Sequence, residues 1–170
     1  LKVIEGNAFS GCESLEKVYW GTDSQLEVIG MGFSQDLWYN VTLEGPFSYC
    51  TALKSIDIPK NVMTIKTSAF YGSGIEEVNF AEDAAIDVLE ATEYYVTNNL
   101  GASQPVTGGM FMGCNQLETI EIPESVLMIS DFAFKGWSGL KRLDIPESVK
   151  YISATGLFYG CSRLEYVSVP

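Results

Sequence analysis

The chain has 170 residues, of which 46% are hydrophobic and 12% aromatic, so it can bury a substantial core as one folded body. Its 22 acidic and 10 basic residues give a net charge of -12, which disfavours nucleic acid and anionic membrane surfaces as partners. The absence of histidine excludes Ser/His and Cys/His catalysis and removes the usual ligand of transition metals. No apolar run reaches the roughly 18 residues of a membrane-spanning helix, so we expect no direct membrane insertion.

One sequence unit recurs six times along the chain. Its copies read FSGCESLEKVYW, FSYCTALKSIDIP, FYGSGIEEVNF, FMGCNQLETIEIP, FKGWSGLKRLDIP and FYGCSRLEYVSVP, and begin at Phe9, Phe47, Phe70, Phe111, Phe134 and Phe158. Subtracting successive positions gives 38, 23, 41, 23 and 24, so the period is about 23 residues with two insertions. A unit of this size cannot bury its apolar face alone, so we expect the units to stack as coils of a solenoid.

Apolar residues occupy fixed positions within each unit. In the fourth copy they are Phe111, Cys114, Leu117, Ile120, Ile122, Val126 and Ile129. The portion LETIEI alternates with period two, which predicts a short strand that turns Ile120 and Ile122 inward and ends at a proline. We expect the equivalent strands to form one short parallel sheet on one face. The stretch ESVLMISDFAF is too irregular for a long helix and predicts an irregular or 3₁₀ turn on the other face.

Two insertions, at residues 30–46 and 90–109, interrupt the regular spacing. Their aromatic and large apolar residues are Phe33, Leu37, Trp38 and Tyr39 in the first and Tyr94 and Tyr95 in the second. Long loops in a compact array are more often functional or mobile than decorative. We favour the interpretation that the aromatics fold back over the convex side and cover the core. A contact with a partner and disorder are the two alternatives.

The four cysteines, Cys12, Cys50, Cys114 and Cys161, occupy the same position of the unit. A nucleophile is a single special residue, whereas this one is periodic, so we interpret the cysteines as small core residues with free thiols. A disulfide would be possible only between the stacked neighbours Cys12 and Cys50, but their side chains should point into the core in parallel. No CxxC pair is present, so the sequence indicates no zinc site, and we expect no cofactor.

The outward positions of the predicted strands form the candidate binding surface. They are Tyr19, Asp57, Asn79, Glu121, Asp144 and Ser168, flanked by Lys17, Ser55, Glu77, Thr119, Arg142 and Tyr166. These positions vary in chemistry while the inward ones do not, as expected where packing constrains only one set. Glu121 and Asp144 would lie about 5 Å apart, as in a retaining glycosidase. Any solenoid with acids at equivalent positions gives this spacing, so a carboxylate-dependent glycoside hydrolase is a remote alternative.

The segments LETIEIP, LKRLDIP, LKSIDIP and LEYVSVP, each preceded by a GC-like pair and an aromatic residue, resemble the leucine-rich repeats of the BspA-like, or Treponema pallidum-type, class. The resemblance covers the chain apart from the two insertions. Members of that class are typically bacterial surface or secreted proteins. The resemblance therefore implies a non-enzymatic module for adhesion or protein binding, with a host extracellular or surface protein as a possible type of partner.

A structural spacer, a stack of coils with no ligand of its own, is the alternative function. A contiguous exposed aromatic or apolar patch on the sheet face would favour binding, whereas a uniformly solvated face would favour the spacer. Both ends of the sequence fall inside a repeat unit. We therefore expect residues 1–170 to be a single leucine-rich-repeat domain within a longer protein.

Overall fold

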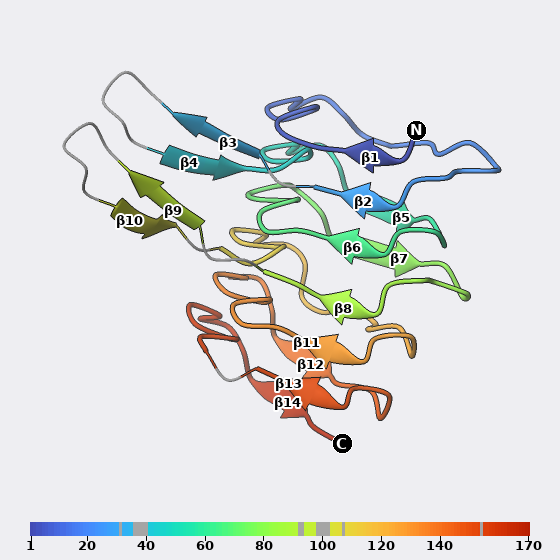
Figure 1. The fold of residues 1–170 in the computed structure, drawn as a ribbon, viewed down its shortest axis with the longest axis vertical. Coiled ribbons are helices and arrows are strands. Elements are labelled where there is room, and N and C mark those ends of the chain that lie inside the picture. Colours follow the sequence, from blue (N-terminus) through green and yellow to red (C-terminus); the bar gives the residue numbers. More distant parts are fainter. Residues whose placement is uncertain (31, 36–40, 92–93, 98–102, 107, 154) are drawn as a thin grey trace.

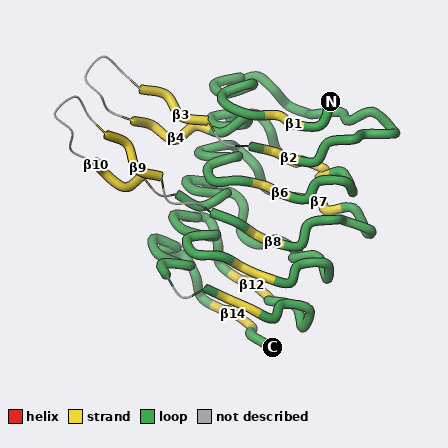
Figure 2. The backbone as a smooth tube through the Cα atoms, in the orientation of Figure 1, coloured by secondary structure: helices red, strands yellow, loops and turns green. Residues whose placement is uncertain are grey.

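The computed structural model describes the chain except residues 31, 36–40, 92–93, 98–102, 107 and 154. Six coils stack along one axis, with the two ends of the chain at opposite ends of the stack (Figure 1). Strands, turns and loops make up the coils, and the described residues contain no helix (Figure 2). The repeat solenoid with parallel strands, expected from the sequence, is confirmed.

The predicted sheet face carries four strands in two separate pairs. Strand β5 (Ser55–Ile58) pairs in parallel with β7 (Glu77–Phe80), and β12 (Arg142–Asp144) pairs in parallel with β14 (Tyr166–Ser168). The equivalent residues 17–20 and 119–122 are not in strands. We call this surface the first face: residues 17–20, β5, β7, residues 119–122, β12 and β14. The expectation of one continuous sheet is therefore wrong in this detail.

A shortened turn accompanies the break between β7 and residues 119–122. The third unit has one residue between Ser73 and Ile75, where the fourth has two between Cys114 and Leu117. The Gly74 amide donates to the Cys50 carbonyl at 3.1 Å, and a Cβ atom at Gly74 would lie 2.0 Å from the Thr51 carbonyl oxygen. The turn of the third unit therefore lies in close contact with the second unit.

A second line of short strands runs along the opposite side of the coils. It consists of β1 (Val3–Ile4), β2 (Val28–Ile29), β6 (Thr64–Ile65), β8 (Val88–Leu89), β11 (Met128–Ile129) and β13 (Tyr151–Ile152). They form two parallel sheets, in the orders β1-β2-β6 and β8-β11-β13. We call these six strands the second face.

The second face corrects the expectation of irregular or 3₁₀ structure there. Within each sheet, its strands form where one coil hydrogen-bonds to the backbone of the next. The Leu127 amide, for example, donates to the Asp87 carbonyl at 2.8 Å, and the Ser130 amide donates to the Leu89 carbonyl at 2.9 Å. Only two residues per unit take part, so no alternation of period two marks these strands in the sequence.

Both insertions form antiparallel hairpins. Strand β3 (Gly32–Gln35) pairs with β4 (Val41–Glu44), and β9 (Tyr94–Thr97) pairs with β10 (Ser103–Val106). In Figure 1 both hairpins project away from the coils instead of folding back over them as we expected. Tyr95 is 66% exposed. Leu37, Trp38 and Tyr39 and the side chains of Phe33 and Tyr94 lie outside the described residues.

A ladder of aromatic rings forms the centre of the core, which runs continuously from Ile4 to Leu157. Successive rings of Phe9, Phe47, Phe70 and Phe111 stack with centroids 5.4, 5.6 and 5.6 Å apart. Trp137 then lies 5.0 Å from Phe111 and 5.9 Å from Phe134, which stacks on Phe158 at 5.7 Å. The repeated phenylalanine thus joins each coil to the next through direct ring contact.

Candidate functional site

The first face presents the twelve residues that the sequence nominated as a binding surface. Ten of them are exposed, and Ser55 and Ser168 are half-buried. The residues between them on the strands, such as Ile56, Val78 and Leu143, are buried in the core. The alternation of inward and outward positions follows the predicted pattern, so packing holds the outward side chains on a fixed backbone.

Arg142, Asp144 and Tyr166 form a compact cluster on β12 and β14. Asp144 accepts two hydrogen bonds from the Arg142 guanidinium, at 3.0 and 3.1 Å. The guanidinium lies 4.0 Å from the centroid of the Tyr166 ring, because the strand register places the two residues opposite each other. The hydrogen bond to Asp144 raises the pKa of Arg142 above its ordinary value. The cluster combines a planar cation with an aromatic face, the chemistry common in protein recognition.

A second pair of nominated residues meets on β5 and β7. The Asn79 side-chain amide donates to Asp57 Oδ1 at 3.1 Å. The Trp20 indole N–H donates to the Asp57 carbonyl at 2.5 Å and so fastens the first unit to the second. Tyr19, at the end of the first face, is 85% exposed. The two exposed aromatics of this surface, Tyr19 and Tyr166, thus belong to the first and last units.

A groove of about 630 Å³ divides the first face between β7 and the fourth unit. We call it the strand groove; residues 76–82 line one wall and residues 119–125 the other. Elsewhere the third and fourth coils stay in contact: Phe70 stacks on Phe111 at 5.6 Å, and β8 pairs with β11. In the described residues, these two coils are thus separated at the strand groove but joined at their aromatic rings and at the second face.

The strand groove is acidic. Five of its lining residues are Glu76, Glu77, Glu82, Glu121 and Glu124, and none is lysine or arginine. Several basic side chains of the described residues are engaged elsewhere. Lys141, for example, lies 2.5 Å from a Glu118 carboxylate oxygen, and this contact lowers the pKa of Glu118. The strand groove was not predicted, although the shorter turn in FYGSGIEEVNF is visible in the sequence.

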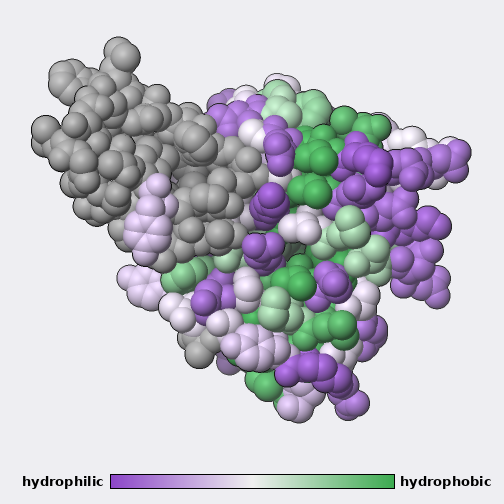
Figure 3. Space-filling view, in the orientation of Figure 1, coloured by the Kyte–Doolittle hydropathy of each residue, from purple (hydrophilic) through white to green (hydrophobic). Residues whose placement is uncertain are grey.

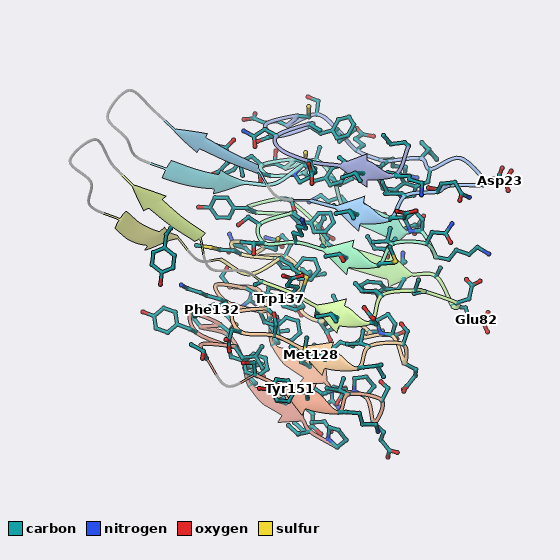
Figure 4. The ribbon with its side chains drawn as sticks, in the orientation of Figure 1. Asp23, Glu82, Met128, Phe132, Trp137 and Tyr151 are labelled. Carbon is teal, nitrogen blue, oxygen red and sulfur yellow. The ribbon has the colours of Figure 1, made fainter. Side chains whose placement is uncertain are left out.

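A further hollow of about 660 Å³ lies where the loops after the first three units meet, and its lining includes Trp20, Pro59, Lys60 and Phe80. The loops after the first and third units carry Asp23 and Glu82 at the edge of the molecule (Figure 4). Lys60 bridges to Asp83 at 3.4 Å. Each of these two loops is two residues longer than in the regular units: five residues separate Trp20 from Leu26 and Phe80 from Ile86, against three between Ile122 and Val126.

The second face carries an apolar stripe that was not predicted from the sequence. Its members are the first residues of the second-face strands, in register within each of the two sheets: Val3, Val28 and the polar Thr64 in one, and Val88, Met128 and Tyr151 in the other. Beside them Met63 and Leu127 are 45% and 52% exposed. Figure 3 shows hydrophobic residues gathered in a band across the coils, with hydrophilic residues on the projecting loops. The apolar patch that would favour binding thus lies on the second face, not on the nominated one.

The cysteines behave as core residues at a repeated position. All four are free, and Cys50 and Cys114 are fully buried. The Cys114 thiol donates to the Phe70 carbonyl of the preceding unit at 3.0 Å, and Cys50 and Cys161 make equivalent bonds. Burial raises the pKa of Cys114 to about 12, and that of Cys50 and Cys161 to about 11. These thiols are poor nucleophiles at neutral pH.

One expectation needs correction at this position. Cys12 is exposed, so the expectation of a core residue is wrong for this cysteine. Trp137 replaces cysteine in the fifth unit, and its fully buried indole donates to the Leu117 carbonyl at 2.7 Å, so the larger side chain keeps a hydrogen bond to the preceding coil.

Glu121 and Asp144, the two carboxylates considered for glycoside hydrolysis, lie in different surroundings. Asp144 is held by Arg142, while Glu121 lines the strand groove in a segment that forms no strand with β12. The described residues contain no group of three or more acidic or cysteine side chains close enough to hold a metal ion. Over the same residues no helix has the length and apolarity needed to cross a membrane.

Comparison with known proteins places this geometry among repeat proteins. The family described as BspA type Leucine rich repeat region (6 copies) matches residues 39–101 and 102–170. A leucine rich cell surface protein from Faecalibacterium prausnitzii A2-165 is 24% identical over 96% of this chain, with a TM-score of 0.58. A leucine-rich repeat protein from Bacteroides ovatus ATCC 8483 is 20% identical over 99% of the chain, with a TM-score of 0.38.

This chain spans 44% of the length of the Faecalibacterium protein and 54% of that of the Bacteroides protein. The likeness to the Faecalibacterium structure supports the solenoid fold. A search of curated proteins gave no match.

Proposed function

The chain belongs to the family of BspA type leucine-rich repeats, and from that premise we propose that it is a non-enzymatic module that binds another protein through its first face. The family suggests a repeat module without catalysis, because stacked coils give an extended surface instead of an enclosed site. The binding surface consists of Lys17, Tyr19, Asp57, Asn79, Glu121, Arg142, Asp144, Tyr166 and Ser168.

The Arg142, Asp144 and Tyr166 cluster is the observation that carries this proposal. Tyrosine and arginine are enriched among residues that dominate binding energy at protein interfaces. Here the guanidinium is already fixed by two hydrogen bonds and a ring contact, so little side-chain freedom remains to be lost on binding. The acidic residues of the rest of the face favour a partner with a basic surface.

The family supports a proposal for the cellular setting. We propose a cell-surface or secreted bacterial protein, of which these repeats are one domain, and a host extracellular or surface protein as the partner. The name of the structurally similar Faecalibacterium protein supports the surface location, and its greater length supports a larger parent chain.

A structural spacer remains the second candidate function, and one observation favours it. The exposed aromatics of the first face, Tyr19 and Tyr166, lie in the first and last units and form no contiguous patch. A solvated face of this kind suits a stack of coils that only sets a distance.

The two functions are separated by capture of host extracellular proteins with immobilised wild type and two triple variants. The first-face variant is Tyr19→Ala/Arg142→Ala/Tyr166→Ala, and the second-face variant is Met63→Ser/Leu127→Ser/Tyr151→Ser. All six side chains are exposed, so both variants should melt close to wild type. We expect only the first-face variant to lose the captured protein. Loss with the second-face variant alone would move the site to the apolar stripe, and no capture by any form would favour the spacer.

A further inference from the structure

Among the described residues, strand β7 pairs with β5 along one edge and has no strand partner along the other. The amides of Glu77 and Ala81 donate toward β5, to the carbonyls of Lys54 and Ile58, each at 3.2 Å. Successive residues of a parallel strand direct their peptide groups to opposite edges, so those of Val78 and Phe80 point into the strand groove. No backbone hydrogen bond of the described chain joins them to the opposite wall. An unpaired edge of this kind is a template for another strand.

The opposite wall is also unpaired on the groove side. Within the described part of the chain, residues 118–122 donate no backbone hydrogen bond, and the Glu118 carbonyl accepts from Lys141 and Arg142 on the far side. Val78 and Ile120, at the floor of the groove, are 7% and 5% exposed, compared with 2% for Ile56 beside a paired strand. The walls run for residues 76–82 and 119–125, long enough for an extended segment of about six residues at roughly 3.3 Å each.

The charge of the walls selects the occupant. Glu76 is bridged by Lys54 at 2.8 Å, but no ion pair of the described residues engages Glu77, Glu82, Glu121 or Glu124. Glu77 and Glu121 are outward residues on the two walls. A strand with a basic residue at every second position would present its cations between these carboxylates, where opposite charges on neighbouring strands stabilise pairing.

We propose that the strand groove binds an extended basic peptide segment of a partner protein, which adds as a strand along β7. The inference rests on the proposed function and specifies its binding mode. Peptide groups of Val78 and Phe80 hydrogen-bond to the main chain of the segment and give affinity, while Glu77 and Glu121 select arginine or lysine at alternate positions. Small apolar side chains between the basic ones face Val78 and Ile120.

The proposal is tested by fluorescence anisotropy with a labelled hexapeptide that alternates arginine and valine. Two control peptides separate the contribution of charge from that of main-chain hydrogen bonds. In one, glutamate replaces arginine, and in the other, proline replaces valine. The proline peptide keeps every charge but lacks half of the main-chain donors. We expect the arginine–valine peptide to bind with 1:1 stoichiometry and both controls to bind at least about tenfold more weakly. Equal binding of the proline peptide would show charge attraction alone and overturn strand addition.

Protein variants locate the site. Glu77→Gln/Glu121→Gln should weaken peptide binding about tenfold at low salt, from about threefold for each removed charge pair. Glu147→Gln/Glu165→Gln removes the same charge from exposed residues outside the groove and should bind like wild type. Equal loss in both variants would overturn the assignment to the groove.

The capture and peptide experiments together distinguish failure of the proposed function from failure of the peptide site. If the captured host protein depends on the Tyr19, Arg142 and Tyr166 variant while the peptide fails to bind, protein binding stands and the strand groove is not its site. If the peptide binds in the groove while no host protein is captured, the strand-acceptor site stands and the biological role falls back to the spacer.

Discussion

Truncation of Phe134 tests the stacking of the coils on which every surface of this protein depends. The Phe134 side chain is fully buried, and its ring lies 5.7 Å from Phe158 and 5.9 Å from Trp137. Phe134 therefore joins the fifth coil to the sixth directly, and to the fourth through Trp137. Phe134→Ala should remove both ring contacts and leave a cavity that the paired strands around it cannot close.

The expected loss of stability is about 3–5 kcal/mol, the range for a buried phenylalanine replaced by alanine. Two aromatic pairs of about 0.5–1.5 kcal/mol each place it in the upper part of that range. Phe9 offers an internal control, because it is 39% exposed and stacks only on Phe47, at 5.4 Å. Phe9→Ala should lower stability by only about 1–2 kcal/mol, since much of its surface is already in contact with water.

Urea unfolding followed by tryptophan fluorescence and circular dichroism measures both variants. The two probes should be compared, because a repeat array can unfold in stages and a single free energy of unfolding then loses its meaning. A loss below about 1 kcal/mol for Phe134→Ala, or equal losses for both variants, would refute the repeat register and the shared core.

Two further predictions concern the turn of the third unit and the buried thiols. Gly74→Ala should destabilise by about 1–3 kcal/mol, because its Cβ would lie 2.0 Å from the Thr51 carbonyl oxygen, while Gly21→Ala, with open space around it, should change thermal unfolding little. Because burial raises the pKa of Cys114 to about 12 from an ordinary 9.0, its thiol ionises first in the unfolded chain, so its contribution to stability is full below about pH 9 and lost as the pH rises toward 12. Urea midpoints between pH 8 and 11 should therefore fall less in Cys114→Ala than in wild type, and parallel falls would contradict a buried thiol.

The sequence was sufficient to predict the parts of the fold that burial determines. Positions such as Phe111, Leu117 and Ile120 recur at constant spacing because each coil packs them against the same position of its neighbour. The same constraint accounts for strands β5, β7, β12 and β14 and for the exposure of the residues between their inward positions. The burial of Cys50 and Cys114 was predictable for the same reason.

Features that depend on the neighbouring coil were not predictable in this way. The second-face strands have two residues each, such as Met128–Ile129, and depend on backbone hydrogen bonds with a neighbouring coil. The second insertion contains a sequence signal for its hairpin, because NNLG, a composition typical of turns, lies between YYVT and SQPV. We did not use this signal when we expected the aromatic residues of the insertion to cover the core.

The strand groove shows where repeat alignment misleads. Matching the third unit to the others by Phe70 and Val78 hides the missing residue before Ile75. That deletion lies beside the step of the first face where the edge of β7 faces residues 119–122 across the strand groove. The nominated residues Asn79 and Glu121, expected on neighbouring strands, consequently line opposite walls.

Hydrogen exchange with and without the arginine–valine peptide tests the central claim most directly, because it reports which backbone amides the ligand covers. Binding through the first face predicts slower exchange in residues 77–80 and 119–122, with Val78 and Phe80 protected most, and unchanged exchange in β11 and β13 of the second face. Protection confined to β11 and β13, or to the two hairpins, would contradict the assignment of binding to the first face.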